Sequence, residues 1–381
     1  MKVAIITDGL SPYVVGGMQQ HSYSLAKFLV LNGNEVTLFH FVKKGQLIPS
    51  ENEINKLFFN NELKFNKVFC FYFPTSVRFP GHYLYNSYRY SKLVYCALKN
   101  HVSSFDFIYS KGFSGWKLLN EKVKGNFKTK VGVKFHGYEM YQYAPSFKIK
   151  LQHLMLRPFV KKINLNADVV FSYGGKITQI IKSIGVPNSK IFDVPSAIDL
   201  HWISKKKLDA SKPLKFLFVG RNERRKGIKE INDAIELVIK SNLDAEFHFV
   251  GLVEKKINIS GSKVQIFYYG EIIDEKNKKD IYDSCDVLLC PSYSEGMPNV
   301  ILEAMSRGLA IIATDVGAIQ LLVSENNGAL LYECKPNLIF DAINKFISMD
   351  NNKLREMKTS SVNKIKEEFL WNNIIEKYIE K

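Results

Sequence analysis

The sequence predicts an α/β protein built from two parallel sheets, each covered by helices on both faces. Short β-branched or aromatic runs alternate with longer amphipathic segments along the chain, an alternation typical of βαβ units around a parallel sheet. A length of 381 residues is more than one hydrophobic core normally serves, so two domains are expected. The composition, 46% apolar and 13% aromatic with 12 prolines, supplies enough apolar surface for two cores.

The first half contains six runs that are expected to be strands. They are residues 3–7, 35–41, 68–73, 107–110, 130–136 and 167–173. A helix is expected at about 18–31, after the first strand. The polar, lysine-rich stretch 204–212 follows the last of these segments, and we interpret it as the linker between two domains.

The alternation starts again after the linker. The expected strands are residues 214–219, 246–250, 264–269, 286–290, 309–314 and 329–332, with helices at 226–240 and 298–307. From about residue 351 the pattern is helical and contains an aromatic cluster, Phe369, Trp371 and Tyr378, that must be buried. The predicted organisation is a Rossmann-like domain at 1–200, a second one at 201–355, and a C-terminal helical segment at 356–381.

The formal net charge is +16, and nearly all of it lies in the first half. Residues 1–200 contain 26 Lys and Arg and 11 Asp and Glu, a net charge of +15, which leaves +1 for the rest. Two interpretations stay open: a solvated lysine-rich surface, or a patch that attracts anionic lipid headgroups or an anionic acceptor. Nucleic acid is not favoured as a partner, because no helix-turn-helix, zinc-finger spacing or RNP-like motif is found.

The cysteines and the apolar runs indicate a cytoplasmic protein. None of the five cysteines forms a C-x-x-C pair, so reduced, buried thiols are expected rather than disulfides or a metal site. The apolar run 3–6 ends at Thr7 and Asp8, and no later run reaches 18 residues. We therefore expect no signal peptide and no transmembrane helix, with the basic first half as the candidate contact to the inner face of a membrane.

Two strand-to-helix junctions carry glycines where a ligand could approach the backbone. Gly16 and Gly17 precede the first helix, whose N-terminus favours an anion, although such a pair is also common in plain chain reversals. In the junction 218–227, Arg221 and Lys226 bracket a turn, so that a guanidinium and an ammonium can converge on a diphosphate. We expect the neighbouring Arg224 and Arg225 to be only solvated.

The segment 291–306 carries the strongest signal. Pro298 suits the first turn of a helix, so that the N–H groups of residues 297–300 can form an anion cradle. Glu295 precedes this helix and Glu303 lies inside it. Two acids near one helix end can bind the hydroxyls of a sugar and of a ribose while the amides hold the phosphates between them; the alternative is a pair of unremarkable surface glutamates.

A histidine ends a strand of the first half. His136 closes the run 130–136, at the carboxyl edge where ligand clefts open in parallel sheets. A purely structural histidine is the alternative interpretation.

With these motifs the chain resembles family 4 of the retaining glycosyltransferases, which have the GT-B fold. The resemblance is carried by Gly16-Gly17, His136-Gly137, residues 167–170, Gly220-Arg221 with Lys226-Gly227, and the E-x7-E pair Glu295 and Glu303. It covers essentially the whole chain in the family's order, although residues 195–199, similar to the family's interdomain segment, lack its Asn and Gly. The resemblance implies two Rossmann-like domains facing across a cleft, with the C-terminal helix crossing back to the first.

The resemblance also implies roles for individual residues. The catalytic residues would be His136, Glu295, Arg221 and Lys226: both cations would stabilise the departing diphosphate, and His136 would contact the donor sugar near the reacting carbon. The donor-binding residues would be Gly16, Gly17, Glu271, Ile272, Gly296, Met297, Pro298, Asn299, Val300 and Glu303. Among these, Glu303 would hold the ribose, and Glu271 with Ile272 would lie close to the base.

The implied reaction moves a sugar, with retention, from a nucleotide-diphosphate sugar to a glycan or lipid-linked acceptor in cell-surface polysaccharide or lipopolysaccharide biosynthesis. A UDP-sugar is the expected co-substrate. No cofactor and no metal are expected, because the chain has no Asp-x-Asp motif. The alternatives are an epimerase or phosphorylase of the same fold, or an inactive basic protein that docks on membranes.

Overall fold

The computed structural model describes residues 1–14, 16–59, 63–77, 79–204, 209, 212–254 and 257–379. They form two compact units. The first contains Met1–Tyr141, Lys150–Pro195 and Ile374–Lys381, and the second contains Gln142–Ile149 and Ser196–Asn373. Most of the predicted linker 204–212 lies outside the described residues.

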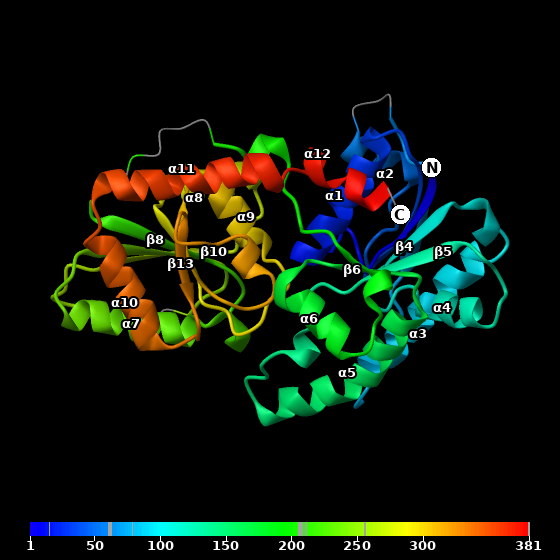
Figure 1. The fold of residues 1–381 in the computed structure, drawn as a ribbon, viewed down its shortest axis with the longest axis horizontal. Helices are drawn as coiled ribbons and strands as arrows, with labels where there is room; N and C mark the ends of the chain where they lie inside the picture. Colours follow the sequence, from blue (N-terminus) through cyan, green and yellow to red (C-terminus); the bar gives the residue numbers. More distant parts are fainter. Residues whose placement is uncertain are drawn as a thin grey trace. The chain divides into compact units, whose positions relative to one another are not determined.

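The first unit is built on a parallel sheet in the order β3-β2-β1-β4-β5-β6-β7 (Figure 1). Its strands are β1 (Lys2–Ile6), β2 (Glu35–Val42), β3 (Lys67–Tyr72), β4 (Phe107–Lys111), β5 (Lys130–Lys134), β6 (Val169–Ser172) and β7 (Ile191–Asp193). Its helices are α1 (Gly17–Leu31), α2 (Glu51–Phe58), α3 (His82–Leu98), α4 (Trp116–Val123), α5 (Phe147–Asn166) and α6 (Gly175–Ser183). The first three residues of α5 are assigned to the second unit. The short strand β7 was not predicted.

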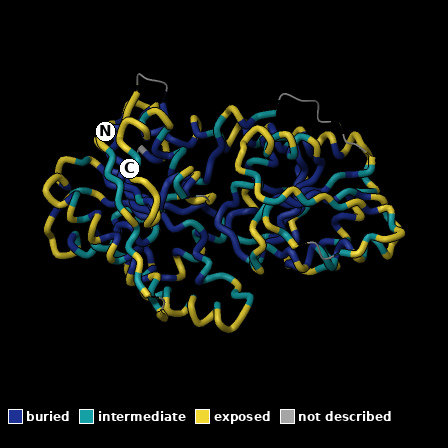
Figure 2. The backbone as a smooth tube through the Cα atoms, turned by 180° about the vertical axis from the view of Figure 1, so that it is seen from behind, coloured by how far each residue is buried: buried dark blue, intermediate teal, exposed yellow. Residues whose placement is uncertain are grey.

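The helices of this unit cover both faces of its sheet. From β1 to β3 the chain moves toward one edge, and from β4 to β7 toward the other. Right-handed crossovers therefore place α1 and α2 on one face and α3, α4, α5 and α6 on the opposite face (Figure 1). Figure 2 shows the strands buried between these layers.

The second unit repeats the architecture with the parallel order β10-β9-β8-β11-β12-β13. Its strands are β8 (Leu214–Val219), β9 (Ala245–Val250), β10 (Gln265–Gly270), β11 (Val287–Cys290), β12 (Ala310–Thr314) and β13 (Gly328–Leu331). Its helices are α7 (Ile228–Lys240), α8 (Glu275–Ser284), α9 (Asn299–Ser306), α10 (Pro336–Ile347) and α11 (Asn351–Glu368), followed by α12 (Trp371–Ile374) and α13 (Glu376–Ile379), which ends in the first unit.

A continuous hydrophobic core supports this second sheet. Phe216 and Phe247 stack on neighbouring strands with ring centroids 5.3 Å apart, and α7 and α10 cover them through Ile235 and Ile343. Both sheets are parallel with helices on either face, so the predicted α/β class with two Rossmann-like domains is confirmed.

The boundaries differ from the predicted ones. The chain passes between the units at Pro195–Ser196 rather than at residue 200, and the predicted segment 356–381 is divided at Ile374. Phe369 and Trp371, expected to cover the first domain, are instead buried in the second unit, where their backbones pair with Ile198. Backbone pairing between these two segments fixes their position, and only the end of the chain, including Tyr378, belongs to the first unit.

No helix in the described part of the chain combines the length and apolarity that crossing a membrane requires.

Candidate active site

The turn after β8 places cations beside the loop after β11, because these two strands are neighbours in the second sheet. The turn contains a short 3-10 helix, Arg224–Lys226, and ends at Gly227 in a left-handed conformation with φ of 72°. A side chain at Gly227 would collide with the carbonyl oxygen of Pro291. Glycine is therefore required for the turn to lie against the end of β11.

Glu295 is the centre of the resulting cluster. Its side chain is buried, and Oε1 accepts hydrogen bonds from Lys226 Nζ at 2.5 Å and Ser292 Oγ at 2.9 Å. A guanidinium nitrogen of Arg225 lies 3.4 Å from the same oxygen. Burial raises the pKa of Glu295, but the attraction of Lys226 and Arg225 outweighs burial, so the pKa lies below its ordinary value. The carboxylate is ionised at neutral pH.

Arg224 and Arg225 are not simply solvated, and that expectation is wrong. Arg224 forms a bidentate pair with Glu230 at 2.8 and 2.7 Å, and it lies over the ring of Tyr293. Arg225 pairs with Glu223 at 2.8 Å in addition to its contact with Glu295. Glu223 and Glu230 are near these arginines in the sequence, and the turn orients them, whereas Glu295 reaches Arg225 only in the folded chain.

Arg221 has a different environment from Lys226. Its side chain is 78% exposed, and its guanidinium lies 3.0 Å from Glu223. Arg221 and Lys226 belong to one turn, but of these two cations it is Lys226 that contacts Glu295 in the structure.

The backbone of Glu295 is held by a residue from far along the sequence. The side-chain amide of Gln142 donates to the carbonyl oxygen of Glu295 at 2.7 Å and accepts from its N–H at 3.3 Å. Next to it, the rings of Tyr143 and Tyr293 stack at 4.7 Å. Behind the loop, Gly317 has a φ of 59°, and a side chain there would collide with the carbonyl oxygens of Glu295 and Gly296.

The predicted anion cradle lies at the start of α9. Pro298 is the N-cap residue, one position before the first helical turn in which it was expected. Ser196 contacts this segment twice: its N–H lies 3.1 Å from the sulfur of Met297, and its hydroxyl bonds Asn299 Oδ1 at 3.2 Å. Gly296 is held through its carbonyl, which accepts from the N–H of Ala318 at 2.8 Å.

Glu303 lies on the next turn of α9 with two partners from α8. Its Oε2 accepts a hydrogen bond from the hydroxyl of Tyr282 at 2.7 Å and pairs with Lys278 Nζ at 2.7 Å. Lys278 and Tyr282 are four residues apart on α8, so both reach the same carboxylate. Val300 is half-buried at the beginning of α9.

The residues expected near the base follow β10. At the ends of β9 and β10, the N–H of Gly251 donates a hydrogen bond to the carbonyl oxygen of Gly270 at 2.7 Å. A side chain at Gly251 would collide with the carbonyl of Gly220 at the end of β8, so these strand ends approach closely. Glu271 is exposed and Ile272 half-buried directly after this edge.

The first unit contains Gly16, Gly17 and His136. Gly16 caps α1 and Gly17 is its first residue, while His136 follows β5. His136 Nδ1 shares a short hydrogen bond with the hydroxyl of Tyr173, and its buried Nε2 has no hydrogen-bond partner among the described atoms. Burial and the nearby Lys111 and Lys134 hold the pKa of His136 well below its ordinary value, so the imidazole is neutral.

Sequence reasoning missed several residues of these clusters. Ser292 stood inside the recognised segment, and the spacing of Lys278 and Tyr282 offered a weak signal. Gln142, Tyr173 and Lys134 offered none, because each reaches its partner only through the tertiary fold.

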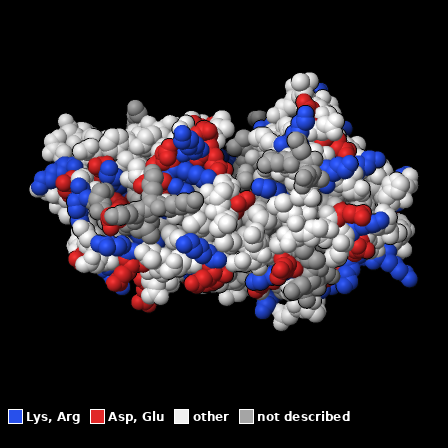
Figure 3. Space-filling view, turned by 90° about the horizontal axis from the view of Figure 1, so that it is seen from above, with Lys and Arg blue, Asp and Glu red and all other residues white. Residues whose placement is uncertain are grey.

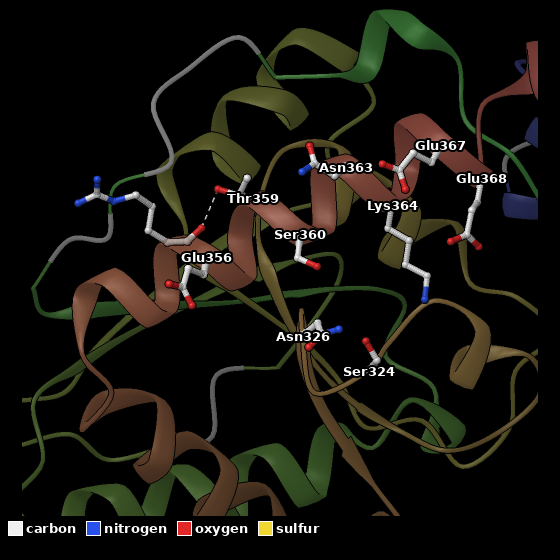
Figure 4. A pocket seen from close by; sticks show the side chains of 10 residues that line it. Ser324, Asn326, Glu356, Thr359, Ser360, Asn363, Lys364, Glu367 and Glu368 are labelled. Atoms are coloured by element: carbon white, nitrogen blue, oxygen red, sulfur yellow. Dashed lines mark hydrogen bonds between the residues drawn. The ribbon is translucent and has the colours of Figure 1, made fainter.

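Two surface hollows of the second unit lie beside other residues. One of about 540 Å³ runs along the outer side of α11 and is lined by Ser324, Ser360 and Asn363 among others (Figure 4); it contains none of the predicted site residues. A second, of about 480 Å³, opens beside residues 222–236. Within the described ranges, no group of three or more His, Cys, Asp or Glu side chains is arranged to hold a metal ion.

Comparison with known proteins identifies the class to which this fold and site belong. The model of Glycosyltransferase Family 4 matches residues 15–202, and that of Glycosyl transferases group 1 matches residues 213–349. Two parallel α/β units matched in this order define a glycosyltransferase. The chain belongs to family 4 of the glycosyltransferases, within group 1.

The relatives with curated names are distant. The putative teichuronic acid biosynthesis glycosyltransferase TuaC of Bacillus subtilis is 30% identical over 130 residues, 34% of this chain and 32% of that protein. The UDP-Gal:alpha-D-GlcNAc-diphosphoundecaprenol alpha-1,3-galactosyltransferase of Escherichia coli is 28% identical over 250 residues, 60% of this chain and 62% of that protein. The matches thus span between about a third and two thirds of these relatives.

Solved structures share the fold along the whole chain. Sucrose-phosphate synthase from Thermosynechococcus elongatus has a TM-score of 0.77 at 18% identity, covering 100% of this chain and 98% of that one. Anabaena HepE in complex with UDP-glucose has a TM-score of 0.68 at 17% identity, with the same coverage. At these identities the likeness supports the fold alone.

Proposed function

We propose that this protein is a hexosyltransferase that moves a sugar from a UDP-sugar, with retention of configuration, to a glycan or lipid-linked acceptor in cell-surface polysaccharide biosynthesis. The carrying observation is the ion pair between the half-buried Lys226 and the buried Glu295 in the loops that follow β8 and β11. The named activities of TuaC and of the galactosyltransferase support this acceptor class, and HepE with UDP-glucose supports the donor.

The leaving group sets the main chemical demand. Breaking the bond between the sugar and the diphosphate develops negative charge on the phosphate. Lys226 and Arg221 would stabilise that charge. A preorganised cation in such a place lowers the activation free energy by about 3 kcal/mol. Because cations take this role, we propose that no metal is needed.

The two glutamates would recognise hydroxyl groups. The contacts of Glu295 with Lys226, Arg225 and Ser292 all fall on Oε1, so Oε2 would accept from the donor sugar. Glu303 shows the same division, since Lys278 and Tyr282 both contact Oε2, and its Oε1 would accept from the ribose. The N–H groups of Met297, Asn299 and Val300 would hold the phosphates between them. Glu271 with Ile272 would border the base.

The first unit would supply His136 and the Gly16-Gly17 turn. A neutral imidazole whose buried Nε2 has no partner among the described residues can bond a sugar hydroxyl. The glycine turn would let a substrate approach the start of α1. We propose a cytoplasmic enzyme that works at the inner face of a membrane and does not bind nucleic acid.

A two-stage experiment tests this function. A thermal-shift panel with UDP, GDP, ADP, dTDP and CMP first identifies the nucleotide, since a ligand at 100 times its Kd stabilises by about 2.7 kcal/mol. The matching nucleotide sugars are then incubated with a diphosphoundecaprenol-linked sugar acceptor, with and without EDTA. We expect a UDP-selective shift, EDTA-resistant transfer, and a product anomer that retains the donor's configuration by NMR.

Other outcomes would identify the alternatives. An epimerised nucleotide sugar formed without acceptor would indicate an epimerase, and release of a sugar phosphate that depends on added phosphate would indicate a phosphorylase. The absence of any nucleotide shift would favour an inactive docking protein and contradict the proposal.

A further inference from the structure

Helix α5 presents apolar side chains to solvent. Phe147 is 82% exposed, Leu151 53%, Leu154 47% and Met155 39%. Their spacing of four, seven and eight residues from the first places them on one helix face. The buried side of α5 already contacts the unit through other residues, including Val160 and Ile163. The exposed stripe is therefore additional to the face that packs on the unit.

The charges of α5 all have one sign. Lys148, Lys150, Arg157, Lys161 and Lys162 lie on this helix, and Phe147–Asn166 contains no acidic residue. At 100° per residue, Lys148 flanks one side of the apolar stripe, and Lys150 and Lys161 flank the other. Lys162 lies on the face of the stripe itself, two turns beyond Met155. On the α1 and α2 side of the same unit, by contrast, positive and negative side chains are interspersed (Figure 3).

The start of α3 extends this surface. Gly81, the residue that caps α3, lies against Met155 of α5: a side-chain Cβ at this glycine would be 3.8 Å from the terminal methyl carbon of Met155. Helices α3 and α5 therefore meet at this point. Phe79 and Tyr85 are exposed next to this contact, with ring centroids 5.9 Å apart. Figure 2 shows α5 as a largely exposed helix at the lower edge of the unit.

We propose that α5, together with Phe79 and Tyr85, docks this protein on an anionic lipid bilayer. A helix with an apolar face bordered by lysines lies in the interface plane of a membrane, with its cations near the headgroups. Each lysine near an anionic surface adds attraction. Arg157 is held by the carbonyl oxygen of Met140 and the ring of Tyr141, so the exposed cations of α5 are its four lysines. A second copy would bring four lysines against four lysines, so the charges favour lipid as the occupant.

Lipid docking also agrees with the environment of the neighbouring aromatic residues. In the segment 71–95, Tyr90 is buried and its hydroxyl donates to the carbonyl of Thr7 at 3.0 Å, so it belongs to the core. The exposed aromatic side chains of this segment are Tyr72, Phe79, Tyr83 and Tyr85, and Phe79 and Tyr85 are the two that lie at the contact between α3 and α5. The described part of the chain has no helix that could cross a membrane, so a docking surface would bring the enzyme to a lipid-linked acceptor. This role of the surface rests on the proposed function.

Vesicle flotation of the full chain tests the docking surface. The vesicles contain 30% phosphatidylglycerol in phosphatidylcholine, or phosphatidylcholine alone, each in 50 mM and 500 mM NaCl. We expect the protein to float with the anionic vesicles at low salt and to be released at high salt. The double variant L151Q/L154Q should bind at least about tenfold more weakly, and K148Q/K150Q should lose affinity mainly at low salt.

Matched controls separate docking from general effects. V123Q/L252Q replaces two exposed apolar side chains elsewhere, and K240Q/K345Q removes two exposed lysines of the second unit; both should float like the unmodified protein. The UDP thermal shift should be the same in all variants, so that loss of docking is distinguishable from failure of the donor site.

Three results would overturn the proposal. The first is no binding of the unmodified protein to anionic vesicles at low salt. The second is unchanged flotation of L151Q/L154Q. The third is a dimer in sedimentation velocity that L151Q/L154Q dissociates, which would assign this face to a second copy of the chain.

Discussion

The side-chain amide of Gln142 bonds both the N–H and the carbonyl of Glu295, at 3.3 and 2.7 Å. One side chain thus fixes both backbone polar groups of the residue whose carboxylate bonds Lys226. Although 153 residues separate them in sequence, Gln142 determines the orientation of the loop between β11 and α9.

Replacing Gln142 with alanine should therefore impair catalysis through Glu295. We expect kcat/KM to fall by about thirtyfold, because two hydrogen bonds that hold the loop are lost, each contributing about 1 kcal/mol. Steady-state kinetics with varied UDP-sugar measures the effect. The exposed Gln152 on α5 supplies a control, Q152A, whose kinetics should match those of the unmodified enzyme. Unchanged kinetics in Q142A would show that the loop between β11 and α9 keeps its conformation without the Gln142 side chain.

The diphosphate cations should be needed for turnover. K226A and R221A are each expected to lower kcat by about a hundredfold, since each removes a cation from the developing phosphate charge. Single-turnover transfer measures the rate, and circular dichroism reports whether the fold is kept. K240A, at the exposed end of α7, should be fully active. Near-normal turnover in either site variant would remove that cation from the mechanism.

Tyr173 should act as a positioning residue for His136. Its hydroxyl bonds His136 Nδ1, and its ring lies 4.0 Å below the ammonium of Lys134. We expect Y173F to lower kcat about tenfold while the KM for the donor changes little, because the imidazole is still present but less firmly oriented. The exposed Tyr332 gives the control Y332F. A proportional loss of thermal stability and activity would instead indicate a purely structural role.

A histidine in the second unit should make stability depend on pH. The ring N–H groups of His201 donate hydrogen bonds to the carboxylates of Asp199 and Glu275, and these bonds raise the pKa of His201 to about 9. Since the folded pKa is above the ordinary value, the protonated ring stabilises the protein fully below about pH 6.5, and this contribution is lost as the pH rises through 9. Because the His201 side chain is half exposed, the contribution of the protonated ring to the free energy of unfolding should stay below about 1 kcal/mol.

Thermal unfolding of H201Q tests that dependence. The unfolding temperature of the variant should lie furthest below that of the unmodified protein at pH 6, and the two should converge by pH 9.5. The exposed His101 on the first unit provides the control H101Q, with no pH-dependent difference. A gap that stays constant across this range would contradict the assignment.

Much of the fold could be read from local patterns. Apolar runs such as 214–219 and 286–290 became the neighbouring strands β8 and β11 with small shifts at their ends, because β-branched and aromatic runs between turn residues have few other stable arrangements. Pro298 was predicted in the first turn of a helix, and it is observed one position earlier, at the N-cap of α9. The short strand β7 was not predicted, because three residues are too few to show the alternation of apolar and polar side chains that marks a strand.

Pairing between distant segments was not readable in the same way. Phe369 and Trp371 were correctly expected to be buried, but their partner, Ile198, lies in the second unit rather than the first. Hydrophobicity indicates that a side chain is buried without indicating where. Arg224 and Arg225 were misjudged because the conformation of the turn, which orients Glu230 and Glu223 toward them, and the approach of Glu295 both come from the fold.

The sequence by itself determined the two parallel α/β sheets and the glycine-bearing turns after their strands. It also placed Arg221, Lys226 and Glu295 in those turns and Glu303 in the helix that follows, because these features depend on the local order of residue types. Only the tertiary structure decided that Lys226 bonds Glu295, that Gln142 holds the backbone of Glu295, and that α5 leaves an apolar stripe exposed. Those features depend on distances and solvent access, which the packing of remote segments sets and the linear order of residues does not contain.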